Sequence, residues 1–312
     1  MARTTTTATC PVCGQTGARV WKTSDLVTSS SSSTNRGAST ATGLVPDDLA
    51  ITDRRYGMTL GLLECRCGFR FADPAELPDL VALYSALDDP AYEEGAAARS
   101  AQQRVLLAAI RRVVPGARTL LDVGAASGLL VGEALAAGLD AVGIEPSATL
   151  AGGARDRGLD VRTGVLPHPE LSDRRFDIVA LVDVVEHVVD PVGLLRAARE
   201  HLAEHGVVLV VTPDAASVAA RVLGKRWWHL RLAHVGYFTQ PTLSDALARA
   251  GLIPMKWWRP GWVFELGYLG ERVGSYVPPV GRLVRRAGDS GLLRRTVPLN
   301  PRDSLAVIAR AS

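Results

Sequence analysis

The sequence lacks several features that would mark other classes of protein. No apolar stretch approaches the roughly 20 residues that a membrane-spanning helix needs, so no membrane segment is expected. The formal net charge of +3 is too small to indicate nucleic-acid binding by itself. The first residues, MARTTTTATC, show no charged-then-apolar signal pattern. We therefore expect a cytoplasmic protein that uses neither a membrane nor a nucleic acid as its partner.

Cysteine is also scarce, because the 312 residues contain only four. They form two close pairs, Cys10 with Cys13 and Cys65 with Cys67. In a reducing compartment such pairs indicate a metal site rather than disulfides. A glycine follows each pair and permits the turn that points backbone N–H groups at sulfur. We predict that the four thiolates hold one structural Zn²⁺, with four ordinary cysteines as the alternative.

What the chain does have is a hydrophobic fraction of 47%, enough for a large core, and an alternation of short apolar runs with helical patterns. Such alternation predicts an α/β fold with a doubly wound, mostly parallel, seven-stranded sheet. Strands are expected at Thr119–Val123, Ala141–Glu145, Asp160–Thr163, Phe176–Val182, Val207–Thr212, Leu252–Trp258 and Ser304–Ala309. Helices are expected at Ala101–Val114, Ser127–Ala137, Ala148–Arg157, Pro191–Leu202 and Thr242–Ala250.

Composition changes along the chain indicate three parts. Residues 1–80 contain Thr and Ser tracts and both cysteine pairs, and we predict a small zinc-ribbon-like domain there. Within it, Thr23–Thr42 is low in apolar residues and is expected to be a loop. Residues 81–117 are expected to be linker helices, and residues 118–312 the main α/β domain with a C-terminal extension.

The segment Thr119–Pro146 is the most informative, because it has the layout of a nucleotide-cofactor site. An apolar run ends in Asp122, passes through a narrow turn into a helix, and is followed by a second run that ends in Glu145. The turn contains the small residues Gly124, Ala126 and Gly128. A carboxylate at the end of the second strand can accept both hydroxyls of a ribose. One alternative is a site for a nicotinamide cofactor, which Asp122 disfavours because its charge would repel a pyrophosphate. The other alternative is a tight strand-to-helix turn that binds no ligand.

Several motifs resemble class I S-adenosylmethionine-dependent methyltransferases. DVGAASG and GIEPS resemble their first motif and the acid after strand two, and RRFDIVALVDVVEHVVDP resembles their fourth-strand segment. GVVLVVTPD and HVGYFTQPTLSDALARAGL extend the resemblance over residues 100–258. Upstream, CPVCG, RYGMTLGLLECRCGFRFADP and LYSALDDPAYEE resemble methyltransferases with an N-terminal zinc ribbon. Two departures are Ala126, where many members have glycine, and Cys65–Cys67, one residue shorter than the usual Cys-x-x-Cys.

The resemblance implies a Rossmann-like methyltransferase fold and a set of residues around S-adenosylmethionine. The methionine part would lie against the turn and Asp122, the ribose against Glu145, and the adenine near Val165 and Leu166. Asp183 would lie at the mouth of the active site. The full predicted cofactor set is Asp122, Gly124, Ala126, Gly128, Glu145, Pro146, Val165, Leu166 and Asp183.

Transfer to a hydroxyl also requires a base, for which histidine is the usual choice. The catalytic candidates are His187, His229, His234 and Tyr237, of which His234 is preferred. The alternative for His187 is a structural role together with Glu186 in the loop after strand four. Trp227 and Trp228 would form either an apolar wall for the acceptor or a cover for the domain edge.

We expect a methyltransferase that acts on a small-molecule or carrier-linked acceptor, such as a sugar or a specialised metabolite, with oxygen as the preferred methyl acceptor and nitrogen or carbon as the alternatives. The alternatives are a zinc-ribbon methyltransferase of ribosomal or transfer RNA and a non-catalytic cofactor-binding scaffold. Few basic residues and no aromatic-basic platform occur in Met1–Pro78, which disfavours RNA. Trp257, Trp258 and Trp262 fit core packing, a substrate site or a homodimer contact. A run of arginines between Arg282 and Arg295 fits a solvated face or a site for an anionic group.

Overall fold

The computed structural model describes residues 5–26, 43–53, 55–274, 276–287, 291 and 293–312. From residue 27 onward, the loop predicted over Thr23–Thr42 lies outside the described residues. The strands are β1 (Arg19–Lys22), β2 (Leu62–Glu64), β3 (Arg70–Ala72), β4 (Thr119–Val123), β5 (Asp140–Glu145), β6 (Val161–Thr163), β7 (Phe176–Val182), β8 (Leu202–Pro213), β9 (Gly236–Tyr237), β10 (Leu252–Trp258), β11 (Trp262–Glu265), β12 (Thr296–Leu299) and β13 (Ser304–Ala311). The α-helices are α1 (Leu80–Ser85), α2 (Ala96–Arg111), α3 (Leu129–Ala136), α4 (Ala148–Asp156), α5 (Pro191–Glu200), α6 (Val218–Leu223), α7 (Gln240–Arg249), α8 (Leu266–Gly274) and α9 (Pro278–Ala287).

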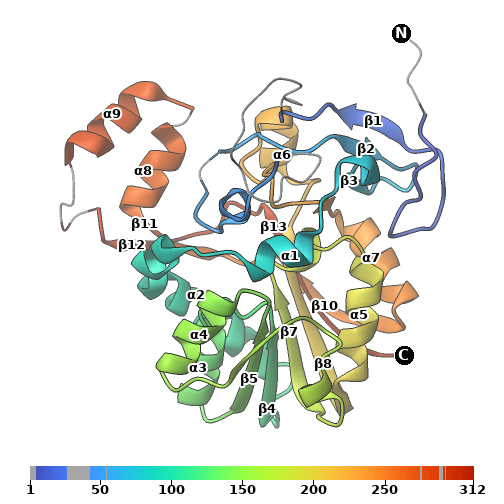
Figure 1. Cartoon of the computed structure of the whole chain (residues 1–312). Coiled ribbons are helices and arrows are strands. Elements are labelled where there is room, and N and C mark those ends of the chain that lie inside the picture. The colour runs from blue at the N-terminus through green and yellow to red at the C-terminus, as the bar shows by residue number, and fades with distance from the viewer. Residues whose placement is uncertain (1–4, 27–42, 54, 275, 288–290, 292) are drawn as a thin grey trace.

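A seven-stranded sheet in the order β10-β13-β8-β7-β4-β5-β6 forms the centre of the molecule (Figure 1). Strands β8, β7, β4, β5 and β6 pair in parallel, and β13 runs antiparallel to both β8 and β10. The chain starts in the middle of the sheet at β4, continues to one edge through β5 and β6, and then returns to the other side at β7. Such a reversal opens a crevice at the carboxyl ends of the strands, where ligands bind in doubly wound folds. The predicted fold class is confirmed.

Both faces of this sheet are buried, as its strands predict. Along β7, Ile178 and Ala180 face the cluster that contains α2, α3 and α4, whereas Val179 and Leu181 face the cluster that contains α5 and α7. Side chains alternate between the faces of a strand, so a continuous apolar run is required where helices cover both sides. The two helical layers are seen on opposite sides of the sheet in Figure 1.

The first residues of two helices differ from the predicted ones because capping residues set where each helix begins. The helix expected from Ser127 begins at Leu129, because Gly128 is its N-cap residue in a left-handed conformation, with φ +78°. The helix expected from Thr242 begins at Gln240, because the Thr239 side chain accepts a hydrogen bond from the Thr242 N–H and caps it.

A second sheet, in the order β1-β2-β3-β9, lies above the carboxyl ends of the parallel strands (Figure 1). Its fourth strand comes from much later in the chain, with Arg70 opposite Tyr237 and Phe71 opposite Gly236. Beneath this sheet, Leu60 and Leu62 share an apolar cluster with Leu230 and Leu232. The N-terminal segment and the 220–237 segment therefore form one packed layer over the main sheet.

The chain leaves the main sheet once more, between β10 and β13. Here β11 and β12 form an antiparallel pair, and α8 and α9 stand apart from the sheet layers in Figure 1. Among the helices described, none combines the length and the apolar character that crossing a bilayer requires.

Candidate functional site

The turn between β4 and α3 is built so that only small residues fit. Gly124 has φ +74°, and a Cβ atom there would lie 2.7 Å from Cγ2 of Val184. A Cβ atom on Gly128 would lie 2.9 Å from Cδ1 of Leu159. Ala126 lies between them at φ +47°, which for a residue with a side chain costs about 1–2 kcal/mol. The alanine therefore keeps the left-handed backbone that glycine adopts without cost.

Glu145 holds this turn in place. Its Oε2 atom accepts a hydrogen bond from the Ala126 N–H at 2.8 Å, and its Oε1 atom accepts one from the Ser147 N–H, also at 2.8 Å. The carboxylate is 5% exposed. Burial raises its pKa, while the two backbone hydrogen bonds act in the opposite direction. Each oxygen has a second lone pair, so the carboxylate can also accept from a ligand.

Two further carboxylates lie at the ends of β4 and β7. Burial, with the charge of Glu145 as a second cause, raises the pKa of Asp122 to about 8. Asp183 is an exposed residue on the cavity wall, and desolvation by the surrounding protein, followed by the charge of Asp303, raises its pKa. Carboxylates whose pKa is raised in this way favour a positively charged ligand, because a cation lowers the cost of ionising them.

One cavity of about 1220 Å³ opens at the carboxyl ends of the parallel strands. Of the predicted residues, it brings together Asp122, Gly124, Ala126, Asp183, His187, His229 and His234. The N-terminal segment, α2 and β11 supply other parts of its wall. Its volume exceeds the roughly 300–1,000 Å³ of an ordinary small-ligand site, which leaves space for a cofactor together with a second molecule.

His187 and His234 meet edge to face on the wall of this cavity, with their ring centroids 4.7 Å apart. The Nδ1 atom of His187 lies 3.0 Å from the carbonyl oxygen of Ala233 and 2.7 Å from the hydroxyl of Tyr84. A carbonyl only accepts, so Nδ1 carries the proton and Nε2 is the free ring nitrogen. Burial, followed by the charge of Arg231, lowers the pKa of His187 to about 4, and burial lowers that of His234 well below its usual value.

His229 is oriented by a buried acid that no sequence motif marks. Its Nε2 atom lies 3.2 Å from Oδ2 of Asp303, which also accepts a hydrogen bond from Nε1 of Trp228 at 2.8 Å. Trp228 thus supports this pair, whereas Trp227 is 3% exposed and belongs to the apolar cluster under the N-terminal sheet. Neither tryptophan is part of the cavity wall as described.

The remaining predicted site residues lie outside the described wall of the cavity, namely Gly128, Glu145, Pro146, Val165, Leu166 and Tyr237. The Tyr237 hydroxyl donates to the carbonyl oxygen of Arg231 at 3.4 Å, and burial raises the pKa of Tyr237. Val165 is exposed and Leu166 is buried at 9% exposure, on the loop that follows β6.

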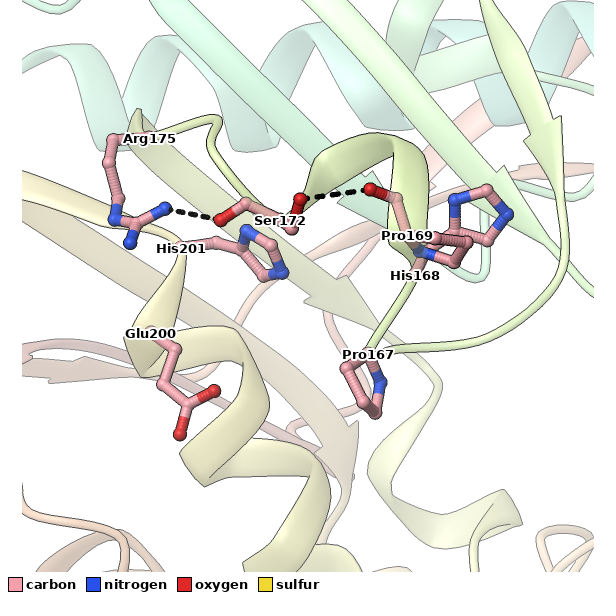
Figure 2. A pocket seen from close by; sticks show the side chains of 7 residues that line it. All are labelled: Pro167, His168, Pro169, Ser172, Arg175, Glu200 and His201. Carbon is pink, nitrogen blue, oxygen red and sulfur yellow. Dashed lines mark hydrogen bonds between the residues drawn. The ribbon is translucent and has the colours of Figure 1, made fainter.

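That loop borders a smaller cavity of about 530 Å³ (Figure 2). Its lining residues are Pro167, His168, Pro169, Ser172, Arg175, Glu200 and His201. The Ser172 hydroxyl donates to the Pro169 carbonyl and the Arg175 guanidinium donates to the Ser172 carbonyl, both at 2.9 Å. None of the predicted site residues lines it.

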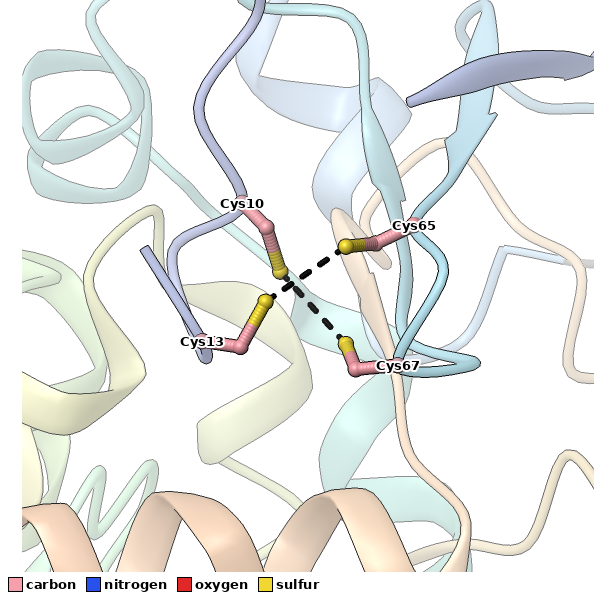
Figure 3. Close-up of side chains that lie close together, drawn as sticks. All are labelled: Cys10, Cys13, Cys65 and Cys67. Atoms are coloured by element: carbon pink, nitrogen blue, oxygen red, sulfur yellow. Dashed lines mark hydrogen bonds between the residues drawn. The ribbon is translucent and has the colours of Figure 1, made fainter. Parts of the chain in front are cut away.

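The four cysteines converge, as Figure 3 shows. Sγ of Cys10 lies 3.8 Å from that of Cys67, and Sγ of Cys13 lies 3.5 Å from that of Cys65. Four sulfurs at about 2.3 Å from a tetrahedral Zn²⁺ would be about 3.8 Å apart, so the donor set fits that ion.

The shortened second pair still forms a turn beside the sulfurs. The Gly14 N–H donates to the Cys10 carbonyl, and the Gly68 N–H donates to the Cys65 carbonyl at 3.0 Å. Both glycines have positive φ, +75° and +91°. One residue fewer between the cysteines therefore does not prevent the four thiols from gathering.

Other cavity residues could not be identified from motifs. Tyr56 comes from the N-terminal segment, and Trp262, Phe264 and Tyr268 come from β11 and α8. Among them, only Trp262 belongs to a cluster seen in the sequence. These aromatic residues approach the β4 turn only through tertiary contacts, so local spacing carries no signal of their position.

Sheet order, cofactor turn and strand-end acids together define a methyltransferase of class I. A family model described as "Methyltransferase domain" matches residues 84–254, more than half of the chain. The chain belongs to this family, which confirms the resemblance noted in the sequence.

Curated relatives agree with that assignment. The ubiquinone biosynthesis O-methyltransferase of Cereibacter sphaeroides is 32% identical over 159 residues, which are 47% of this chain and 64% of that protein. The protein of the same name from Hydrogenovibrio crunogenus is 29% identical over 199 residues, which are 58% of this chain and 80% of that protein. A crystal structure of an S-adenosylmethionine-dependent methyltransferase from Archaeoglobus fulgidus shares 16% identity, covers 71% of this chain and 99% of its own, and has a TM-score of 0.46.

Proposed function

We propose that the protein transfers a methyl group from S-adenosylmethionine to an oxygen atom of a small-molecule acceptor. The observation that carries this proposal is that Asp122 and Gly124, at the cofactor turn, line the same cavity of about 1220 Å³ as His187, His229 and His234. Family membership and the names of the curated relatives support it.

In this proposal the cofactor lies across the ends of β4 and β5. Asp122 and Asp183 face its positively charged sulfonium and ammonium groups, and Gly124, Ala126 and Gly128 keep the turn close to it. Glu145 accepts the ribose hydroxyls with the lone pairs that its two backbone hydrogen bonds leave free. Pro146, Val165 and Leu166 complete the set on the nucleoside side.

The chemistry is a displacement at the methyl carbon. The bond from sulfur to the methyl carbon breaks with its electron pair remaining on sulfur, and a bond from the acceptor oxygen to that carbon forms. The acceptor hydroxyl loses its proton to a base, for which the histidines of the cavity wall are the candidates. Because the sulfonium is already activated, the main task of the protein is to align the two reactants.

The acceptor is a compact molecule with a hydroxyl group. Tyr56, Trp262, Phe264 and Tyr268 line the cavity and suit a planar or sugar ring. The relatives named for ubiquinone biosynthesis favour a ring hydroxyl. More specifically, we propose that the acceptor is a sugar or a specialised metabolite, either free or attached to a carrier.

We further propose that Cys10, Cys13, Cys65 and Cys67 hold a structural Zn²⁺. The ion would join the start of the chain to the β2–β3 hairpin. Four protein ligands would leave it no open position, so it would stabilise the N-terminal layer without taking part in the reaction.

Methyl-labelled S-adenosylmethionine tests the function. The protein is incubated with the label and with separate panels of ring-hydroxyl compounds, sugars, and total RNA. Label in a low-mass O-methyl product is expected, and it should be lost in Asp122→Asn but kept in Asp156→Asn, an exposed aspartate on α4. Label confined to RNA or protein would contradict the proposed acceptor class.

A further inference from the structure

Three side chains on the cavity wall have potential metal-ligand atoms that lie close to one another. Glu186 and His187 form the short turn after β7, and His234 comes from the segment that precedes β9. One potential ligand atom from each lies within 4.8 Å of the other two. Three ligands spaced evenly around a first-row ion, each about 2.2 Å from it, are about 3.8 Å from one another, so side-chain movements of about 1 Å suffice to bring all three to one ion.

Two of these residues have atoms without a partner in a buried position. Oε1 of Glu186 and Nδ1 of His234 have no hydrogen-bond partner within the described part of the chain. Glu186 is 1% exposed and His234 is 7% exposed. Buried polar atoms are almost always satisfied, so such a pair in one place indicates a missing partner. Since a neutral imidazole nitrogen and a carboxylate oxygen are both electron donors, a cation satisfies both.

The surroundings of the three residues are those of metal ligands. The Glu186 carboxylate is held through Oε2, which accepts from the Thr212 hydroxyl at 2.9 Å, and this leaves Oε1 available. His187 is held through Nδ1 by Ala233 and Tyr84, and this leaves Nε2 available. Metal-bound histidines and carboxylates are usually fixed by such contacts through their second polar atom.

We propose that Glu186, His187 and His234 form a second metal site, which binds a divalent first-row ion at the wall of the acceptor cavity. Two histidines and one carboxylate are a known donor set for Zn²⁺ and Fe²⁺, and they leave coordination positions open. All three residues line the cavity, so these positions face the space proposed for the acceptor. The site differs from the cysteine cluster in its donors, which contain no sulfur.

The role of this ion in catalysis rests on the proposed function. The ion would bind the acceptor oxygen, lower the pKa of its hydroxyl and hold the resulting oxyanion in line with the methyl group. The hydroxyl proton would be released to the solvent in the open cavity, and the oxyanion would form the bond to carbon as sulfur leaves with its electron pair. His187 and His234 would then act as ligands instead of bases.

Zinc stoichiometry tests the site independently of turnover. The full chain is saturated with Zn²⁺, freed of excess metal, and its zinc content is measured. We expect two equivalents in the wild type, and one in both Glu186→Gln and His234→Gln. His205→Gln, a change of an exposed histidine, should retain two. One equivalent in the wild type, or two in both cavity variants, would overturn the inference.

Cobalt identifies which site each equivalent fills. With Co²⁺ in place of Zn²⁺, the first equivalent should show the sulfur-to-metal absorption of thiolate ligands, and the second should add none. A second equivalent that increases this absorption would place the metal at cysteine and contradict the site. S-adenosylmethionine titrations of the same samples separate the two proposals, because cofactor binding without a second zinc refutes only this one.

Discussion

Replacing Glu145 with glutamine should reveal how strongly one carboxylate supports the cofactor turn. In the native protein its two oxygens each accept one backbone N–H, from Ala126 and from Ser147, both at 2.8 Å. Glutamine has the same shape but a single acceptor oxygen, so one of these buried N–H groups would face an NH₂ donor. A buried donor left without its partner costs about 1–3 kcal/mol.

This loss of free energy should weaken the binding of S-adenosylmethionine. If the turn must be held as it is for the cofactor to bind, a loss of about 1–3 kcal/mol weakens S-adenosylmethionine binding roughly 5- to 150-fold. The loss of the negative charge near the ribose acts in the same direction. The melting temperature should also fall, because the lost hydrogen bond is one of the contacts that hold Ala126 at its unfavourable φ of +47°.

Calorimetric titration with S-adenosylmethionine and a thermal unfolding curve measure both effects. Glu133→Gln is the matched control, since Glu133 on α3 pairs with Arg104 at 2.7 Å near the surface and contributes little. If Glu145→Gln bound the cofactor as tightly as the wild type and melted at the same temperature, the reasoning about the turn would be refuted.

Three further predictions concern charge, packing and metal. The pKa of Asp122 is raised to about 8 in the folded protein, so its contribution to stability is full at acid pH and is lost as pH rises through about 8. A cationic cofactor favours the ionised carboxylate, so affinity for S-adenosylmethionine should rise by up to about tenfold per pH unit between about pH 6 and 8, and less steeply in Asp122→Asn. A flat affinity profile in the wild type would be the contrary result. Gly128→Ala places a Cβ atom 2.9 Å from Leu159 at φ +78°, and denaturant unfolding should show a loss of stability of about 1–3 kcal/mol. Gly153→Ala, where the added Cβ would lie in open space on α4, should show no such loss. Equal stability of the two variants would count against the packing argument. Removal of zinc by a chelator should lower the melting temperature of the wild type but leave Cys67→Ser unchanged, and an insensitive wild type would argue against metal at the cysteines.

The sequence predicts the main sheet well because its strands are buried on both faces. The run Phe176–Val182 lies in the centre of the sheet and appears in the structure with those bounds. Leu252–Trp258 also keeps its predicted bounds, although it is an edge strand with exposed side chains at Ile253 and Met255. The cofactor turn is equally visible, since positive φ at Gly124 and Gly128 requires residues that the sequence displays directly. Local patterns suffice where local conformation decides the structure.

Contacts between distant segments could not be read in this way. Strand β9 is only two residues long and exists because Tyr237 pairs with Arg70, 167 positions earlier in the chain. The Asp303 carboxylate reaches Trp228 and His229 only after β13 has entered the sheet beside β8. The helices α8 and α9 were not expected either, since no prediction covered Leu266–Gly274 and the arginines between Arg282 and Arg295 were interpreted as a solvated face or a site for an anionic group.

The most direct test of the account is a calorimetric titration of the purified full-length chain with S-adenosylmethionine, alongside a nicotinamide dinucleotide. Binding of one S-adenosylmethionine per chain, weakened by Asp122→Asn, with no heat from the dinucleotide, is the predicted result. No heat with S-adenosylmethionine, together with binding of the dinucleotide, would contradict the assignment of the cavity to a methyl donor.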